Sequence, residues 1–335
     1  MNKTLWGDRS AGGSPPVFAL DGDGDGNVIR VGSEPVVRAH TRLMGLLGAD
    51  MRHADLAFAF NNRLLSLWNP EFLYLPYSVK NGHLADAVRG LRALDILSCN
   101  VTFPHKVTIM EHLDEIDEET RRMGSVNLVV NRDGVLAGYN TDIEGFMHAL
   151  YASGVAPDLH STLIFGCGGA GRALAAALAL AGMERVWVYD IVEEKGHAVE
   201  MVHNHNGRQR VVTVARTQLA RLRPELIVNA TPLGRGEEAD VSPVDEEMLT
   251  GGIADAASLF FDLNYNPPRS RFLQQADRLG IAAENGLRMM CYQAKRSIEI
   301  AAGKEIPWDW YEDAIEEEGL NRYMVSASTR ESAAA

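Results

Sequence analysis

The sequence predicts an α/β protein with two lobes: an N-terminal α/β lobe and a second lobe built on a doubly wound parallel sheet. Three observations support this prediction. The chain has 335 residues, which is too long for one ordinary core and suits two domains. Short apolar runs alternate with segments of helical spacing in two successive series. The second series opens on an apolar strand, a glycine-rich turn and a helix at 161–181.

Composition narrows the class of protein. The net charge is −13, which argues against a general binder of nucleic acid or anionic membranes. The longest run of small apolar residues, 174–183, is too short to span a bilayer, and the first residues lack the apolar segment of a signal peptide. The three cysteines are scattered along the sequence and do not form a disulfide framework, which fits a reducing compartment. We therefore expect a cytoplasmic protein without a membrane or nucleic-acid partner.

Residues 1–38 are rich in glycine, proline and aspartate, and we expect them to form an extension that is partly disordered. Within them, the spacing of Asp21, Asp23 and Asp25 resembles the opening of an EF-hand calcium loop. Gly32, however, stands at the twelfth loop position, where a bidentate glutamate is needed. We expect a plain acidic turn and no metal site.

From residue 39 onward the pattern alternates between strands and helices. The first series predicts strands at 42–48, 72–79 and 96–102, helices at 81–94 and 106–113, a hairpin over 124–140 with its turn at 131–134, and a helix over 141–154. Thr141 and Glu144 have the spacing of a capping box at the start of the last helix, and Gly154 closes it.

The second series has the pattern of a parallel sheet. It predicts strands at 161–166, 185–190, 225–231 and 258–265, a helix at 170–181, a further helix between the second and third of these strands, and helices from 269 onward. The tail from about 319 is predicted to be disordered.

The glycine-rich turn reads GCGGAG, with Gly166, Gly168 and Gly171 in the G-x-G-x-x-G spacing of a Rossmann dinucleotide site. Gly169 and Ala170 complete the turn. Asp190 ends the next strand, where a carboxylate can accept both ribose hydroxyls of an adenosine and would repel a 2′-phosphate. We therefore expect NAD as the cofactor, with NADP less favoured.

Lys106 and Asp142 each lie in the expected first turn of a helix. Pro104 suits the first position of the helix that carries Lys106. The positive end of a helix dipole disfavours a cation and favours a carboxylate. A lysine and a carboxylate that face one substrate hydroxyl can move its proton while a hydride leaves its carbon. The alternative is a structural ion pair or two solvated side chains.

Over residues 42–310 the chain resembles the shikimate/quinate dehydrogenase family. The matching stretches, in order, are NVTFPHK (100–106), GSVNLVV (124–130), GYNTDIEGF (138–146), FGCGGAGRA (165–173), VNATPLG (228–234), FDLNYNP (261–267) and NGLRMMCYQA (285–294). The resemblance implies reversible NAD(P)-dependent oxidation of a ring hydroxyl in a cleft between the lobes. It also implies a substrate-binding domain of residues 39–150 plus 287–318, a Rossmann domain of residues 151–286, and a tail of residues 319–335.

The resemblance also implies roles for individual residues. Lys106 and Asp142 look like the catalytic pair. The residues that look like substrate ligands are Asn100, Thr102, Asn127, Gln293 and Tyr265. The residues that correspond to the nicotinamide half of the cofactor site are Asn229, Thr231, Pro232, Gly286 and Met289. A polar strand end and core packing are the alternatives for Asn229, Thr231 and Met289.

One stretch departs from the family pattern. The substrate loop of the family has a pattern like H-S-x-S-P-x-x-H-N, whose serine pair binds the ring carboxylate, and the corresponding stretch here is RHADLAFAFNN. His53 matches, whereas Ala54 and Leu56 replace the two serines and cannot donate hydrogen bonds. The remaining departures are Ala57 for the proline, Phe60 for the second histidine, and Leu128 for a threonine after Asn127.

A desolvated carboxylate without partners costs several kcal/mol. We therefore expect a dehydrogenase for a shikimate-like ring or a cyclitol, in which Arg52 or His53 could replace the serines. Ordinary shikimate or quinate oxidation, as in aromatic amino acid biosynthesis, is the alternative. A non-catalytic NAD-binding sensor is a hypothesis of another class, and the presence of both Lys106 and Asp142 argues against it. Family members occur as monomers and dimers, so a homodimer is one option.

Overall fold

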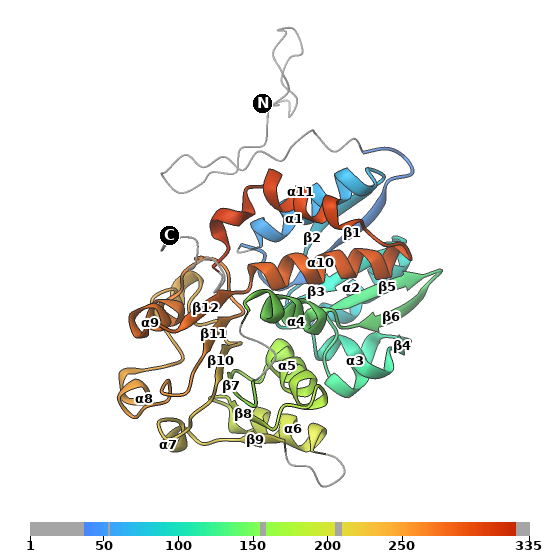
Figure 1. Cartoon of the computed structure of the whole chain (residues 1–335). Helices are drawn as coiled ribbons and strands as arrows, with labels where there is room; N and C mark the ends of the chain where they lie inside the picture. Colours follow the sequence, from blue (N-terminus) through green and yellow to red (C-terminus); the bar gives the residue numbers. More distant parts are fainter. Residues whose placement is uncertain (1–36, 53, 155–158, 205–209, 326–335) are drawn as a thin grey trace, which may run out of the picture.

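The computed structural model describes residues 37–52, 54–154, 159–204 and 210–325. The acidic turn of residues 21–26 and His53 lie outside these ranges. Within the described ranges no helix is long and apolar enough to cross a membrane. The chain forms two lobes that meet along the helices α4 (Asp142–Ala152) and α10 (Leu287–Ala302), which pack side by side (Figure 1).

The first lobe contains a mixed six-stranded sheet in the order β2-β1-β3-β5-β6-β4. Its strands are β1 (Arg42–Gly48), β2 (Phe72–Ser78), β3 (Ser98–Val101), β4 (Glu115–Ile116), β5 (Leu128–Arg132) and β6 (Val135–Tyr139). Its helices are α1 (Asp55–Trp68), α2 (Leu84–Ala93), the short 3₁₀ helix η1 (Thr108–His112) and α3 (Glu118–Met123). β1 pairs in parallel with β2 and β3, whereas β5 runs antiparallel to both of its neighbours.

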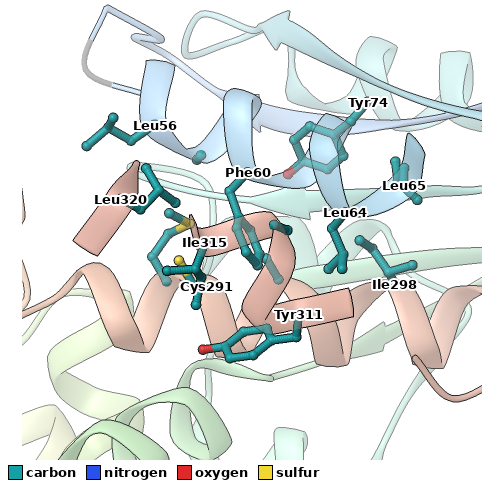
Figure 2. Packing of buried hydrophobic residues seen from close by; sticks show 14 of the residues in the cluster. Leu56, Phe60, Leu64, Leu65, Tyr74, Cys291, Ile298, Tyr311, Ile315 and Leu320 are labelled. Atoms are coloured by element: carbon teal, nitrogen blue, oxygen red, sulfur yellow. The ribbon is translucent and has the colours of Figure 1, made fainter. Parts of the chain in front are cut away.

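Helices cover both faces of this sheet. On one face α1 packs against α10 and α11 (Trp308–Glu317), which return from the end of the chain (Figure 1). Figure 2 shows this core, where Phe60 of α1 lies beside Cys291 of α10 and meets the ring of Tyr311 edge to face at 5.8 Å. On the other face, α2 and η1 bury Val88 and Ile109. The first lobe is therefore completed by residues far away in the sequence.

The second lobe contains a six-stranded sheet, all parallel, in the order β12-β11-β10-β7-β8-β9. Its strands are β7 (Ser161–Phe165), β8 (Arg185–Tyr189), β9 (Val211–Thr213), β10 (Leu226–Asn229), β11 (Leu259–Asp262) and β12 (Ala282–Asn285). Its helices are α5 (Gly169–Leu180), α6 (Glu193–His203), α7 (Arg216–Leu219), η3 (Gly236–Glu238), α8 (Glu246–Thr250) and α9 (Arg271–Leu279). The predicted doubly wound parallel sheet and the two-lobed α/β class are confirmed.

The predicted hairpin is also confirmed. β5 and β6 pair from Leu128↔Tyr139 to Arg132↔Val135. The two connecting residues, Asp133 and Gly134, have φ values of 53° and 89°, as the tightest hairpin turns require.

Several sequence-based expectations about elements are wrong. The stretch read as a loop around residues 52–62 is mostly the helix α1, whose apolar side chains fill the core. β9 and β12 were not expected, because each has only three or four residues and little alternation. The expected helix at 106–113 is a turn followed by η1, and the Phe103–Pro104 peptide is cis.

Lys106 therefore does not occupy the first turn of an α-helix. It lies in the turn before η1. Buried His105 fixes this turn, because its Nε2 lies 2.7 Å from the carbonyl oxygen of Val79. The helix-dipole argument for Lys106 does not apply, whereas Asp142 does begin α4 as expected.

Residues 319–325 are ordered, which corrects the expected disorder for this part of the tail. Leu320 begins the short 3₁₀ helix η4 (Leu320–Tyr323) and is completely buried against α1 and α11 (Figure 2). Val325 is buried in the core of the second lobe, and Asn285 donates its Nδ2 to the carbonyl of Tyr323 at 2.7 Å. The segment thus contacts both lobes.

Replacing Leu320 with alanine should destabilise the protein by about 2–5 kcal/mol, because it leaves a cavity in a closed apolar core. Chemical denaturation measures the difference. Asn321→Ala, one residue away and exposed, is the matched control and should change the stability by less than about 0.5 kcal/mol. Equal stability of the two variants would contradict the packing of this tail.

Candidate active site between the lobes

A cavity of about 260 Å³ lies where the lobes meet, a volume suited to a small ring. Residues that follow β7, β10, β11 and β12 line one side of it, and the first lobe lines the other. The chain builds the sheet outward from β7 to β8 and β9 on one side, and then crosses to β10, which pairs with β7 on the other side. This is the topological switch point, where open α/β sheets bind their ligands.

Lys106 and Asp142 form an ion pair at the wall of this cavity. Lys106 Nζ lies 2.5 Å from Asp142 Oδ2, and the two side chains are 16% and 6% exposed. Asp142 is the first residue of α4, where the helix dipole stabilises a carboxylate. The predicted pair is thus brought together within direct reach of the cavity.

Asn127 connects this pair to α10 and to the start of α4. Its Oδ1 accepts a hydrogen bond from the backbone N–H of Thr141 at 2.7 Å. Its Nδ2 lies 2.8 Å from Asp142 Oδ1 and 3.0 Å from Gln293 Oε1, so it links the start of α4 to α10. The hydroxyl of Thr141 joins this network and does not cap the helix through a capping box, which corrects that expectation.

A second chain of hydrogen bonds holds Asn100. The Tyr74 hydroxyl donates to Asn100 Oδ1 at 3.0 Å, and Asn100 Nδ2 donates to Ser297 Oγ at 2.8 Å. Ser297 Oγ also lies 3.0 Å from Thr141 Oγ1, so the two chains meet. The five predicted substrate ligands, Asn100, Thr102, Asn127, Tyr265 and Gln293, all line the cavity.

The glycine-rich turn approaches the pair from the other lobe. A Cβ at Gly169 would lie 2.7 Å from Lys106 Cβ, so only glycine permits this contact. A Cβ at Gly171 would lie 1.9 Å from the carbonyl oxygen of Gly166, as the close packing of strand on helix requires. A Cβ at Gly168, in contrast, would meet nothing within 4 Å. The backbone at Gly168 therefore faces open space in front of the N-terminus of α5, which fits a bound pyrophosphate.

Most of the predicted cofactor residues line the cavity, whereas Asp190 and Asn229 do not. Those that line the cavity are Gly168, Gly169, Ala170, Thr231, Pro232, Gly286 and Met289. Asp190 lies beyond it at the end of β8, where its carboxylate accepts from the N–H groups of Cys167 at 2.8 Å and Val192 at 2.9 Å. Asn229 is fully buried, and its side chain bonds to Thr231 and Asp262. Its geometry is that of a support for the loop after β10.

Asp262 is the centre of that support. It is completely buried, and its Oδ1 accepts from Asn229 Nδ2 at 3.0 Å and from the backbone N–H of Asn264 at 2.9 Å. Its Oδ2 accepts from Ser270 Oγ at 2.5 Å. Asn264 Nδ2 in turn donates to the carbonyls of Thr231 and Leu233, both at 3.0 Å. Burial raises the pKa of Asp262 to about 7, although these hydrogen bonds partly offset the shift.

The start of α1, where the family pattern has its serines, offers no hydroxyl donor. Ala54 precedes the helix, and Leu56 points into the core (Figure 2). Arg52 does not replace them: its Nη2 lies 2.7 Å from Asp50 Oδ2, its side chain is 73% exposed, and it does not line the cavity. From α1 only Ala57 and Asn61 line the cavity.

Several residues of the site were missed in the sequence. Tyr74, Asn61 and Arg235 line the cavity, and Ser297 links Asn100 to Thr141. Ser297 follows Gln293 by one helical turn, a spacing that could have indicated it. The others carry no motif of their own. In the described part of the chain, no three His, Cys, Asp or Glu side chains gather to hold a metal ion.

The fold and the cavity define a two-lobed dinucleotide-binding oxidoreductase. The description of the family model that matches residues 46–129 is "Shikimate dehydrogenase substrate binding domain". A shikimate dehydrogenase (NADP(+)) of Moorella thermoacetica is 35% identical over 81% of this chain and 91% of its own length. The chain therefore belongs to the shikimate/quinate dehydrogenase family and is an oxidoreductase of the class that acts on CH–OH groups.

Solved structures agree with this assignment. A shikimate 5-dehydrogenase from Thermus thermophilus, in complex with NADP(H) and shikimate, is 29% identical with a TM-score of 0.70, covering 83% of this chain and 99% of its own. A quinate dehydrogenase from Corynebacterium glutamicum, in complex with NAD, is 25% identical with a TM-score of 0.71, again covering 83% of this chain and 99% of its own. A nicotinamide cofactor is therefore supported for the family as a whole.

The raised pKa of Asp262 predicts a pH dependence of stability. Because the folded protein holds this proton to about pH 7 and the unfolded chain only to about pH 4, the free energy of unfolding should fall as the pH rises between these values. The slope from this residue is at most about 1.4 kcal/mol per pH unit. Asp262→Asn mimics the neutral form and should flatten the profile, as measured by urea denaturation at several pH values.

Asp240→Asn, at an exposed position, is the matched control and should keep the profile of the wild type. An unchanged slope in the Asp262→Asn variant would contradict the assignment of this proton to Asp262.

Proposed function

We propose that the protein catalyses reversible hydride transfer at a hydroxyl of a polyhydroxylated ring, with Lys106 and Asp142 as its acid–base pair. The ion pair in the cavity wall, with the stem of Lys106 directly against Gly169 of the glycine-rich turn, carries this proposal. This contact supports a role for the pair in proton transfer, because it lies beside the expected position of the dinucleotide. Family membership supports the same reaction class.

Side chains of the first lobe bind the ring hydroxyls that neighbour the reacting carbon. Asn100, Thr102 and Gln293 present amide and hydroxyl groups that bind neighbouring ring hydroxyls. Gln293 Oε1 already accepts from Asn127, so its Nε2 is the group left to donate to a ring hydroxyl. The glycine-rich turn and the N-terminus of α5 would hold the pyrophosphate of a dinucleotide, whose nicotinamide would supply or accept the hydride.

Lys106 transfers the proton of the reacting hydroxyl. In the oxidation direction its neutral amine accepts the hydroxyl proton as the hydride leaves the carbon, and in the reduction direction its ammonium returns it. Asp142 stabilises the ammonium form of Lys106 and orients it. Asn127 in turn fixes the carboxylate of Asp142, because its Nδ2 donates to Asp142 Oδ1. Oxidation of the hydroxyl to a carbonyl thus releases one proton and one hydride, and reduction takes up the same two.

The ring substrate is shikimate-like or a cyclitol. The altered start of α1 supports a substrate pocket different from the ordinary one of the family, because Ala54 and Leu56 give no hydrogen bonds to a ring substituent. The ordinary substrates shikimate and quinate stay as the alternative, favoured by the names of the relatives.

Lys106→Ala should lower kcat at least ~10²-fold while dinucleotide binding is retained, because the proton loses its carrier but the glycine-rich turn is intact. Steady-state kinetics and calorimetric titration with NAD measure the two effects. Lys304→Ala, an exposed lysine in the same lobe, is the control and should behave as the wild type. Unchanged kcat in Lys106→Ala would remove Lys106 from the mechanism.

We further propose that NAD is preferred over NADP. Asp190 at the end of β8 is followed by Glu193 and Glu194 in the first turn of α6, so a 2′-phosphate would meet negative charge. The curated relative named above is a shikimate dehydrogenase (NADP(+)), and basic side chains that could favour a phosphate are Lys195 and Arg216. Arg216 is, however, engaged by Asp245.

The ratio of kcat/KM for NAD to that for NADP should exceed one in the wild type and fall at least ~10-fold in Asp190→Ser, since the repulsive carboxylate is removed. Glu184→Ser, at the opposite end of β8, is the matched control and should keep the ratio. A wild-type preference for NADP would overturn the proposal.

A further inference from the structure

Among the residues that the structure describes, three charged side chains line the cavity: Lys106, Asp142 and Arg235. The first two form an ion pair and neutralise each other. Arg235 therefore leaves the site with a net positive charge, in a chain whose overall net charge is −13. Such a local charge attracts an anionic ligand.

Arg235 is available for a ligand. It is half-buried, and no hydrogen bond or ion pair of its guanidinium occurs within the described part of the chain. Arg52 on the facing lobe, in contrast, is engaged by Asp50 through both Nε and Nη2. An arginine at the wall of a ligand cavity without an acidic partner is suited to a carboxylate, because its planar fork presents parallel N–H groups.

The backbone that carries Arg235 is held firmly. Asn264 Nδ2 and Asn229 Nδ2 both donate to the carbonyl of Leu233, at 3.0 and 2.9 Å. Gly234 takes a φ of 96°, and its N–H donates to the carbonyl of Glu238 at 2.9 Å. The buried carboxyl of Asp262 anchors both asparagines. The loop is therefore pre-organised, which reduces the entropy cost of binding.

Tyr265 supplies a second donor near Arg235. Both residues line the cavity, and burial raises the pKa of the Tyr265 hydroxyl to about 12, an effect that the nearby charge of Arg235 partly opposes. The hydroxyl therefore keeps its proton at neutral pH. A guanidinium and a phenol hydroxyl together offer a carboxylate the hydrogen bonds that the start of α1 lacks.

We propose that Arg235, together with Tyr265, binds an anionic substituent of the ring substrate from the dinucleotide-binding lobe. This inference rests on the proposed function and narrows its substrate to the class of polyhydroxylated ring carboxylates. Ring hydroxyls bind to the first lobe and the carboxylate to the second. The substrate thereby bridges the lobes, and Arg235 replaces the lost serines as a determinant of specificity.

Shikimate and its methyl ester form a matched pair of probes, because they share the ring and differ in the charge. In the wild type, kcat/KM should be at least ~10-fold higher for shikimate. Arg235→Met should raise KM for shikimate about 10- to 100-fold with little change in kcat, and should leave the ester nearly unaffected. Arg235→Lys should restore part of the affinity, since it returns the charge without the planar fork.

Arg221→Met, an exposed arginine of the same lobe, is the control and should leave all values unchanged. Equal KM for shikimate in Arg235→Met and the wild type would overturn the inference, as would equal losses for shikimate and its ester. Turnover of the ester or of carboxylate-free cyclitols with shikimate inert would overturn it while the proposed function stands. If the wild type oxidises none of these rings with either dinucleotide, both fail.

Discussion

The side-chain amide of Asn127 is the interaction on which the site depends. It is 2% exposed, and it binds at once the start of α4, the carboxylate of Asp142 and the amide of Gln293 on α10. A buried polar network of this kind is stable only when each member is satisfied, and it then permits one arrangement. The position of Asp142, and through it that of Lys106, follows from this constraint.

The same network explains why the end of the chain returns to the first lobe. α10 carries Gln293 and Ser297 into the site on one face, while Cys291 and Ile298 fill the core beneath α1 on another (Figure 2). Met289 of the same helix packs with Phe146 of α4 and the strands of the second lobe. One helix thus packs into both cores and supplies part of the site. The glycine at position 169 completes the junction, because it lets α5 touch Lys106.

Much of this could be predicted from the sequence. The doubly wound sheet, the hairpin, the glycine-rich turn and the pairing of Lys106 with Asp142 depend on local patterns or on motifs of fixed spacing. Two kinds of feature could not be predicted. The helix α1 is not evident in the sequence, because its first residues align with a substrate loop of the family. Leu56, Phe60 and Leu64 nevertheless have helical spacing. The ordered tail depends on the tertiary burial of Leu320 and Val325, which no local period reveals.

The candidate site likewise has features that the sequence predicts and features that it does not. Thr141 has the spacing of a cap, but burial gives its hydroxyl better partners in Asn127 and Ser297. The side chain of Asn229, a residue expected at the nicotinamide half of the cofactor site, is fully buried and supports the loop after β10 through its hydrogen bonds to Asp262 and Leu233. Arg235 follows a family stretch without belonging to it, and only the meeting of two lobes places it in the cavity. Contacts across the cleft are therefore the part that sequence patterns miss.

A crystal structure of the protein with NAD and shikimate would test the central claim most directly. The account predicts the reacting hydroxyl within hydrogen-bond distance of Lys106 Nζ and Asp142, with its carbon facing the nicotinamide ring beside Gly169. A ring bound with no hydroxyl near Lys106, or a nicotinamide on the far side of the cavity from the pair, would contradict it.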